Sequence, residues 1–348
     1  MSKVIFAIPG EINKKSGGYL YDRKLIAELS KMGFDIRTLE LAESFPLPDL
    51  WAMEDAQSKL IGVPSGDALI IDGLAFGALS DELVNQIAAP IIALVHHPLA
   101  EETGLDPNLR SSLYLQEHRN LKLAKAVIVT SEYTARLLTE KYDVEKERIT
   151  VATPGFEQQQ FQRAPQSAPL ILSVGIQVFR KGHDVLLRAL SKIKDLEWQA
   201  LIAGAAVDPK YATDLQALLV ELGLETRVRL AGFVSEQDLT DLYVKATIFA
   251  LATRFEGYGI VFNEALGYEL PIVSCDVGAV SETLGTAGVL VSKEDSDGFA
   301  VELRKLLTDS KRLQSLEENS RLRALSLPSW SQSFSKVAQL LDSLNQVG

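Results

Sequence analysis

Two glutamates flank a glycine-bearing turn in the C-terminal half of the chain. Glu256 lies in the turn, and Glu264 follows eight residues later in a segment with a helical pattern of apolar residues. The first N–H groups of a helix have no intrahelical acceptors and lie at its positive end, so residues 259–261 could bind phosphate. An ionised carboxylate only accepts hydrogen bonds, and beside an anion site it suits sugar and ribose hydroxyls. The spacing therefore predicts a nucleotide-sugar site, with the donor held at Gly257, Tyr258, Gly259, Ile260 and Val261.

Two basic residues form a second candidate site. Arg180 and Lys181 follow a predicted strand at 170–174 and precede a predicted helix at 185–193. Such cations suit a diphosphate, because both side chains make charge-assisted hydrogen bonds with phosphate oxygens. The alternative for both sites is a solvated surface, where glutamates and basic residues are commonly found. Their placement at strand ends of an α/β chain favours ligand binding.

A pair of histidines, His96 and His97, follows a predicted strand at 90–95. Parallel sheets bind ligands at the carboxyl ends of their strands, and a histidine there can bind a hydroxyl or share a proton. A hydrogen-bonded structural histidine is the alternative. Successive residues of a strand point in opposite directions, so only one of the two can face a ligand. Adjacent histidines chelate one ion poorly and no H-x-x-x-H pair exists, so no metal site is predicted.

A weaker candidate follows the first predicted strand, at 3–8. Gly17 and Gly18 end a polar loop before a predicted helix at 19–32. The pair lies where sheets bind ligands, but the loop lacks G-x-G-x-x-G and a phosphate-loop lysine. By itself a Gly–Gly pair indicates a tight turn. A further strand, at 68–72, is predicted to end in a turn at Asp72-Gly73.

The composition is typical of a soluble globular protein, with 47% hydrophobic and 23% charged residues among 348. A net charge of −11 argues against a nucleic-acid-binding surface. The single cysteine, Cys275, excludes an intramolecular disulfide and is expected in the core. No signal peptide is expected, and no apolar run approaches the ~20 residues that span a bilayer. We expect a cytoplasmic location; peripheral contact with the inner face of the membrane and the oligomeric state stay open.

Buried-looking strands alternate with amphipathic helices along the chain, which predicts an α/β fold with parallel sheets. The polar, glutamine-rich run 157–168 is predicted to link two domains.

The donor segment resembles a family motif. The run F-E-G-Y-G-I-V-F-N-E-A-L, followed by L-P-I-V, is similar to the donor-binding motif of the retaining GT-B glycosyltransferases of family 4 (group 1). The resemblance covers almost the whole chain, most strongly 170–291. It implies the GT-B fold, two doubly wound Rossmann-like domains facing each other across a cleft. Residues 1–160 would form the acceptor-binding domain and 168–326 the nucleotide-sugar-binding domain, with 327–348 a helix that returns to the N-terminal domain.

The resemblance also implies roles for the candidate residues. Members of the family carry a histidine after the corresponding strand that contacts the sugar near the reacting carbon; His96 is favoured here, with His97 the alternative. Glu256 would position the sugar, and Glu264 would bind the ribose. Three further groups complete the implied set: Gly17 and Gly18 beside the donor diphosphate or the acceptor, Lys181 on the diphosphate, and the loop Gly232, Phe233 and Val234 around the base.

Two positions depart from the family pattern. Ile176 stands where the family usually has an arginine, although Lys181 and Gly182 match. Either Arg180 reaches the phosphate instead or the site has one cation fewer. Glu269 stands where the family usually has a glycine, which predicts a local difference at the end of the preceding helix.

The resemblance implies a metal-independent hexosyltransferase without a bound cofactor. It would move a sugar, with retention, from a nucleotide-sugar, UDP- or GDP-linked, to a hydroxyl of a saccharide or lipid-linked acceptor. Synthesis of cell-surface polysaccharide or glycolipid is the expected setting, and the sugar and the acceptor stay open. The alternatives are a nucleotide-sugar epimerase of the same fold and a degenerate sugar-nucleotide-binding protein, for which the isoleucine at position 176 is the support.

Overall fold

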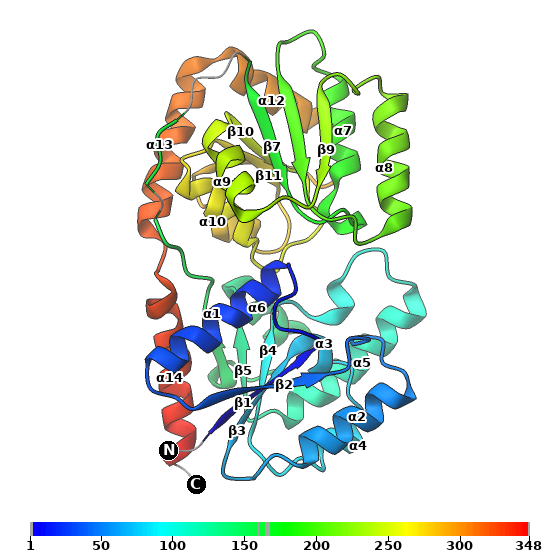
Figure 1. Ribbon diagram of the computed structural model, residues 1–348, viewed down its shortest axis with the longest axis vertical. Helices are drawn as coiled ribbons and strands as arrows, with labels where there is room; N and C mark the ends of the chain where they lie inside the picture. Colours follow the sequence, from blue (N-terminus) through cyan, green and yellow to red (C-terminus); the bar gives the residue numbers. More distant parts are fainter. Residues whose placement is uncertain (1–2, 159, 164–167, 347–348) are drawn as a thin grey trace. The chain divides into compact units, whose positions relative to one another are not determined.

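The computed structural model describes residues 3–158, 160–163 and 168–346 (Figure 1). The chain divides into two units, the first made of Met1–Gly155 and Pro328–Gly348 and the second of Phe156–Leu327. Each unit contains one six-stranded sheet in which all paired strands are parallel. The predicted α/β class with two parallel sheets is therefore confirmed.

The sheet of the first unit has the strand order β2-β1-β3-β4-β5-β6. The chain thus runs outward in one direction from β1 to β2 and in the other from β3 to β6, and ligands of such sheets bind where the direction changes, beside β1 and β3. The strands are β1 (Val4–Pro9), β2 (Ile36–Leu41), β3 (Ala68–Asp72), β4 (Ile91–Val95), β5 (Ala126–Val129) and β6 (Ile149–Val151). The helices are α1 (Gly17–Lys31), α2 (Leu50–Ile61), α3 (Gly73–Phe76), α4 (Asp81–Val84), η1 (Leu99–Glu101), α5 (Pro107–Leu123), α6 (Glu132–Lys141), η2 (Lys146–Arg148) and α14 (Trp330–Gln346).

The sheet of the second unit has the order β12-β11-β10-β7-β8-β9, so its direction changes between β7 and β10. Its strands are β7 (Leu170–Val174), β8 (Gln199–Ala203), β9 (Val228–Gly232), β10 (Ile248–Leu251), β11 (Ile272–Cys275) and β12 (Gly288–Val291). Its helices are η3 (Phe179–Lys181), α7 (His183–Ser191), α8 (Pro209–Glu221), α9 (Glu236–Lys245), α10 (Ile260–Gly267), α11 (Val280–Leu284), α12 (Ser296–Thr308) and α13 (Ser310–Ser326). The predicted strand at 170–174 coincides with β7.

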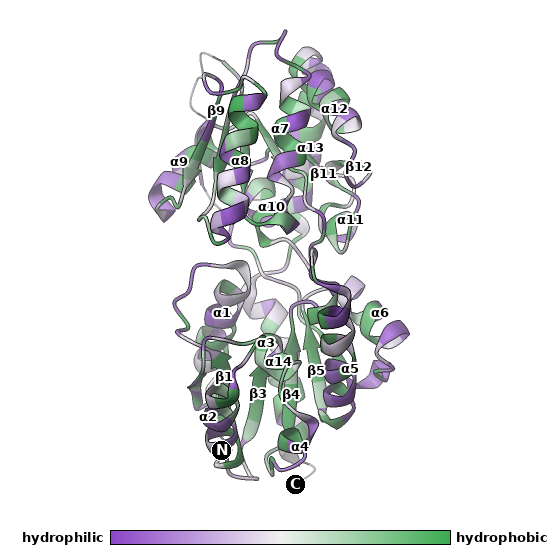
Figure 2. Cartoon of the chain, turned by 90° about the vertical axis from the view of Figure 1, so that its right-hand side faces the viewer, coloured by the Kyte–Doolittle hydropathy of each residue, from purple (hydrophilic) through white to green (hydrophobic). Residues whose placement is uncertain are grey.

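Successive residues of the second sheet face two different cores, as the period of two in a strand requires. Ile248 and Ala250 of β10 pack with residues of α7, α8 and α12, whereas Phe249 and Leu251 pack with residues of α9, α10 and α11. Both faces are thus covered, which explains why the strands are mostly apolar (Figure 2). Cys275 lies in the first of these cores and is 1% exposed, as predicted.

The C-terminal helix α14 belongs to the first unit, where it packs against α1 (Figure 1). The rings of Trp330 and Phe334 from α14 meet the ring of Tyr21 from α1 edge-on, with centroids 6.1 and 5.1 Å away. The backbone of Trp330 leaves no space for a side chain at Gly155, because an added Cβ would lie 2.2 Å from its nitrogen. None of the helices within residues 3–158, 160–163 and 168–346 is long and apolar enough to cross a membrane.

The described part of the predicted linker packs on the second unit. Arg163 donates hydrogen bonds to the carbonyls of Ala246, Tyr268 and Glu269, and Phe161 contacts the Tyr268 ring. Residues 159 and 164–167 of this run lie outside the described residues.

Two local structures differ from the sequence-based expectation or refine it. Asp72 does not close a simple turn: its carboxylate accepts the backbone N–H of Leu74 and caps α3. Glu269 has a φ of +54°, the left-handed conformation that a glycine adopts without strain after a helix. At this position the family usually has a glycine, and Glu269 adopts the backbone conformation that such a glycine would adopt.

A buried glutamate gives the first unit a testable pH dependence. Glu117 on α5 is 1% exposed; its Oε2 accepts the Leu99 N–H, and its Oε1 has no hydrogen-bond partner in the described structure. Burial raises the pKa of Glu117 from 4.5 to about 8. The folded protein thus holds this proton while the unfolded chain releases it, so stability falls as the pH rises from about 4.5 to about 8, by up to about 1.4 kcal/mol per pH unit.

Glu117→Gln, which cannot ionise, should remove this contribution. Urea unfolding of the variant between pH 5 and 8 should show a smaller loss of stability than the unchanged protein, and the variant should be the more stable of the two at pH 8. Glu140→Gln, at an exposed position of α6, is the control. Parallel pH profiles for Glu117→Gln and the unchanged protein would show that Glu117 does not carry the dependence.

Candidate functional site

The candidate residues of the second unit lie beyond the two strands at which the sheet changes direction. The segment after β7 contains Arg180 and Lys181, and the segment after β10 contains Glu256. Because β7 and β10 are hydrogen-bonded neighbours and parallel, their carboxyl ends lie side by side. The topology thereby brings two loops that are far apart in sequence to one edge of the sheet.

Two glycines fix the position of the loop that carries Glu256. Gly182 has a φ of +63°, and a Cβ there would lie 1.8 Å from the carbonyl oxygen of Ala252. Gly278 has a φ of +55°, and a Cβ there would lie 2.1 Å from the carbonyl oxygen of Glu256. These contacts require residues without a side chain, so the backbone of the loop is packed from both sides.

Glu256 is the acceptor of a compact polar cluster. It is 5% exposed, and its Oε1 lies 2.6 Å from Lys181 Nζ and accepts the Thr253 hydroxyl at 3.1 Å. Its Oε2 lies 3.7 Å from Arg180 Nη1, beyond hydrogen-bond distance. Burial alone would raise the pKa of Glu256, but Lys181 and Arg180 outweigh it and lower this pKa below its usual value. The cluster therefore contains one carboxylate and two cations.

A buried arginine that sequence reasoning missed holds the two loops together. Arg254 is 4% exposed, and its guanidinium donates to both oxygens of Asp184, at 2.8 Å each, and to Glu294. It also donates to the Phe179 carbonyl and lies 3.8 Å from the centre of that ring. The bidentate geometry ties the loop after β10 to the start of α7. Arg254 stands next to the candidate residues in the sequence, but nothing there distinguishes it from a surface charge.

The start of α10 has the free amides that the sequence predicts. Gly259 precedes the helix with a φ of +88°, and the N–H groups of Gly259, Ile260 and Val261 have no acceptor among the described residues. The Tyr258 side chain is 7% exposed and its hydroxyl pairs with Asn263, while its carbonyl accepts the Thr283 hydroxyl, so the side chain is not placed to bind a ligand. Gly257 completes the turn between Glu256 and this helix.

Glu264 is held by a tyrosine. Its Oε2 accepts the Tyr243 hydroxyl at 2.7 Å, while Oε1 has no partner in the described part of the chain. Tyr243 is 2% exposed and stacks on Tyr268, with ring centroids 5.1 Å apart and planes 3° from parallel. Burial raises the pKa of Glu264, and the hydrogen bond from Tyr243 opposes this rise. One carboxylate oxygen is thus fixed by the protein and the other is available to a ligand.

The loop after β9 contains the residues expected around a base. The carbonyl of Gly232 accepts the Gly204 N–H at 2.7 Å, the Phe233 side chain is 59% exposed, and Val234 packs partly into the core. Gly175, which follows β7, lies against the Lys181 stem: a Cβ there would be 3.2 Å from it. Ile176 is next in this loop and supplies no charge.

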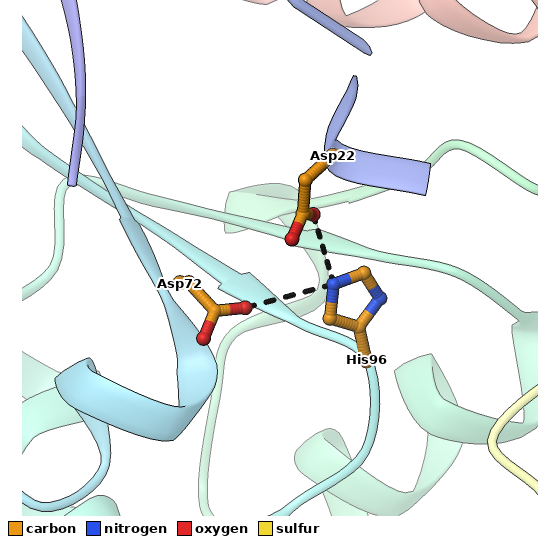
Figure 3. Close-up of side chains that lie close together, drawn as sticks. All are labelled: Asp22, Asp72 and His96. Atoms are coloured by element: carbon orange, nitrogen blue, oxygen red, sulfur yellow. Dashed lines mark hydrogen bonds and ion pairs between the residues drawn. The ribbon is translucent and has the colours of Figure 1, made fainter. Parts of the chain in front are cut away.

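In the first unit, His96 lies between two aspartates (Figure 3). Its Nε2 is 3.0 Å from Asp22 Oδ1 of α1 and 3.6 Å from Asp72 Oδ2 of β3. Both carboxylates are nearly buried, with side chains 2% and 3% exposed, whereas the histidine side chain is 20% exposed. Gly18 lies against the same ring, since a Cβ there would be 3.4 Å from its Cδ2. The structure thus places Gly18 beside His96, and Gly17 is the first residue of α1, directly before Gly18.

The close contacts among Asp22, Asp72 and His96 shift the pKa values of Asp72 and His96. Burial and, to a smaller extent, the nearby Asp22 together raise the pKa of Asp72 to about 7, while His96 opposes the shift. Burial acts to lower the pKa of His96, but the attraction and hydrogen bond of Asp22, with Asp72, outweigh it and raise this pKa. Both shifts favour the protonated forms of Asp72 and His96 relative to the same groups in water.

The two histidines contact different partners, as their adjacency predicts. His97 Nε2 lies 3.6 Å from Glu102 Oε2, whereas His96 lies next to the aspartates. Asp22, Asp72 and His96 also form the one group of described residues whose ligand-type atoms lie close enough, within 4.8 Å, to hold a metal ion. Sequence reasoning missed both aspartates, although Asp22 shares a helix face with Gly18, four positions earlier, and Asp72 ends a strand at the switch point.

Residues 155–323 match a protein-family model described as "Glycosyl transferases group 1". This segment is therefore similar to the group 1 glycosyl transferases. It comprises nearly all of the second unit and contains Lys181, Glu256 and Glu264, so the resemblance inferred from the donor motif is confirmed. His96 lies outside the matched segment.

Curated proteins with similar sequences include an MMP alpha-(1->4)-mannosyltransferase of Mycolicibacterium hassiacum, 26% identical over 82% of this chain and 72% of that protein. D-inositol 3-phosphate glycosyltransferases of Thermobispora bispora and Corynebacterium kroppenstedtii are 27% and 30% identical, over 70% and 63% of this chain. The chain spans only 60% and 53% of the length of these two relatives.

Solved structures with the same architecture include a sucrose-phosphate synthase from Thermosynechococcus elongatus, with a TM-score of 0.86, 19% identity and full coverage of both chains. HepE from Anabaena, in complex with UDP and glucose, has a TM-score of 0.78 and 17% identity, over 99% of this chain and 100% of that one. At this identity the likeness concerns the fold, and it confirms the predicted GT-B class with two Rossmann-like domains.

Proposed function

We propose that the protein is a retaining glycosyltransferase that takes a sugar from a nucleotide-sugar donor and transfers it to an acceptor hydroxyl. The proposal rests on the types of groups that the second unit places at the carboxyl ends of β7 and β10. There the free amides at the start of α10, the cations Lys181 and Arg180, and the carboxylates Glu256 and Glu264 meet at one sheet edge. Amides and cations suit a diphosphate, whereas the carboxylates suit hydroxyls.

Each group has a role in this proposal. The amides of Gly259 to Val261 and the side chains of Lys181 and Arg180 bind the diphosphate, with Arg180 serving in place of the arginine absent at position 176. Glu256 accepts a hydroxyl of the transferred sugar through Oε2, the oxygen that Lys181 does not engage. Glu264 accepts a ribose hydroxyl through Oε1, and the loop Gly232 to Val234 surrounds the base.

The rate-limiting bond to break is the anomeric C–O bond, through an oxocarbenium-like state. Negative charge grows on the departing diphosphate, and Lys181, Arg180 and the helix amides stabilise it there. The acceptor hydroxyl attacks the same face of the sugar and gives its proton to an oxygen of the leaving phosphate. No protein nucleophile and no metal ion are required in this sequence of events.

The relatives support a choice of substrates to test. HepE has been solved with UDP and with UDP-glucose, which supports a UDP-sugar as the first donor, with GDP-sugars next. We propose a hydroxyl of a saccharide or a lipid-linked saccharide as the acceptor, in the cytoplasm or at the inner face of a membrane, in synthesis of cell-surface polysaccharide or glycolipid. WaaG, a neighbour of the same fold, is described as involved in lipopolysaccharide biosynthesis.

A thermal-shift screen tests the donor. A ligand that binds only the folded protein raises the melting temperature, so UDP, GDP, ADP and their sugars can be ranked directly. The selected donor is then incubated with and without acceptors. Free nucleotide that appears only with acceptor supports transfer, whereas a new sugar nucleotide shows an epimerase and binding without turnover shows a sugar-nucleotide-binding protein. No shift with any nucleotide would exclude the proposed site.

A further inference from the structure

The environment of His96 in the first unit is asymmetric. One ring nitrogen, Nε2, faces Asp22 and Asp72, whereas the other, Nδ1, lies on the opposite side of the ring (Figure 3). Nδ1 has no hydrogen-bond partner among the described residues. The protein therefore occupies one nitrogen and leaves the other available.

The contact with Asp22 determines which nitrogen carries the proton. An ionised carboxylate only accepts hydrogen bonds, so the 3.0 Å contact between Asp22 Oδ1 and Nε2 requires a hydrogen on Nε2. Asp72 Oδ2 lies 3.6 Å from the same nitrogen, so its carboxyl group is on the same side of the ring. A neutral His96 must then have its lone pair on Nδ1, and a charged His96 has an N–H there.

The surroundings hold the ring in place. The Tyr21 ring meets it edge-on, with centroids 5.3 Å apart, and the Thr130 hydroxyl donates to the His96 carbonyl. Gly18 lies against the Cδ2–Nε2 edge. The backbone carbonyl, the Cδ2–Nε2 edge and Nε2 of His96 are thus engaged by the protein.

We propose that Asp22, together with Asp72, is a positioning residue that keeps His96 protonated at Nε2 and directs Nδ1 to a hydroxyl of the substrate. The proposal rests on the proposed glycosyltransferase function for the identity of that substrate. A hydroxyl fits Nδ1 in either charge state, because it accepts a hydrogen bond from the charged ring and donates one to the neutral ring. A sugar carries such hydroxyls, so it can pair with Nδ1 whether His96 is charged or neutral.

Two tyrosines of α1 beside this group, Tyr19 and Tyr21, do not carry charge in this range. Burial raises the pKa of both hydroxyls well above the usual tyrosine value. Their hydroxyls donate to the carbonyls of Pro9 and Ala152. The charge state of His96 therefore depends on Asp22 and Asp72.

The first experiment follows the nitrogens of His96 by 15N NMR of the full chain without substrate, between pH 5 and 9. The chain has 4 histidines, so a His96→Gln spectrum assigns the signals. We expect the neutral ring to carry its hydrogen on Nε2. In the double variant Asp22→Asn/Asp72→Asn this preference should disappear and the pKa of His96 should fall, because two carboxylates are lost.

A matched control is present in the same unit. Asp143 Oδ2 lies 2.9 Å from Nε2 of His118, on the surface. Asp143→Asn should alter the signals of His118 and leave those of His96 unchanged. A neutral His96 with its hydrogen on Nδ1, or an unaltered tautomer and pKa in the double variant, would overturn the proposal. So would a His96 signal that changes when EDTA is added, since Nε2 would then bind a metal ion.

The second experiment measures turnover of Asp22→Asn, provided that its melting curve shows a folded protein. We expect kcat to fall roughly tenfold or more and its pH profile to shift with the pKa of His96, while nucleotide affinity stays unchanged, because the nucleotide-site residues lie in the second unit. Asp143→Asn should keep full activity. Normal kcat with an unshifted profile would overturn the positioning role. If the unchanged protein transfers no sugar from any donor, the proposed function fails, whereas the NMR result still decides how His96 is held.

Discussion

Replacing Lys181 with alanine should lower kcat by about 10²–10³-fold and change the KM for the donor much less. The reason is the growth of negative charge on the diphosphate as the sugar leaves, which makes the contact with the Lys181 ammonium stronger in the transition state than in the bound donor. Steady-state kinetics at several donor concentrations separate the two parameters.

The Lys181 experiment needs a check on folding, because this side chain also pairs with the buried Glu256. Breaking a buried pair destabilises a protein by about 3–5 kcal/mol when the remaining charge is left uncompensated. Here Arg180, 3.7 Å away, still faces that carboxylate.

Lys181→Met keeps much of the stem packed against Gly175 and should show the same loss of turnover in a folded protein. Lys210→Ala removes an exposed lysine that pairs with Asp214 and should have no effect. Normal turnover in Lys181→Met would remove Lys181 from the leaving-group site.

Replacing Glu264 with alanine should weaken binding of the nucleoside diphosphate roughly tenfold or more. Its Oε1 is available to a ribose hydroxyl, and a hydrogen bond to a charged group contributes about 1.5–3 kcal/mol. Isothermal titration of the diphosphate, without the sugar, measures this contact in isolation.

Tyr243→Phe provides a milder form of the Glu264 experiment. It removes the hydrogen bond that fixes Oε2 and preserves the stacking on Tyr268, so affinity should fall by less than in Glu264→Ala. Glu225→Ala, at an exposed position of the same unit, is the control. Unchanged affinity in a folded Glu264→Ala variant would show that the ribose is bound elsewhere.

The candidate residues differ in how far the sequence could identify them. Glu256, Lys181 and His96 each follow a short apolar run, and such runs reveal strand ends without any knowledge of the fold. The free amides at the start of α10 were also predictable, since they follow from a glycine turn before a helix.

Asp22 and Asp72 carried no comparable signal. Asp22 lies inside a helix, where an aspartate is usually solvated, and Asp72 before a glycine is typical of a turn. Arg254 and Tyr243 were equally inconspicuous, although each holds a carboxylate next to or within the site. Their roles depend on burial, and burial depends on the neighbours that the fold supplies.

The sequence by itself determined the α/β class, the ends of strands such as β7, the core position of Cys275 and the family of the donor segment. These properties follow from local patterns: apolar runs, glycine turns and a fixed spacing of two glutamates. Only the tertiary structure decided which residues meet. Lys181 and Glu256 are 75 positions apart, and His96 and Asp22 are 74 apart. They come together because non-consecutive strands pair at the point where each sheet changes direction, and pairing of distant strands is a property of the whole chain that no local pattern specifies.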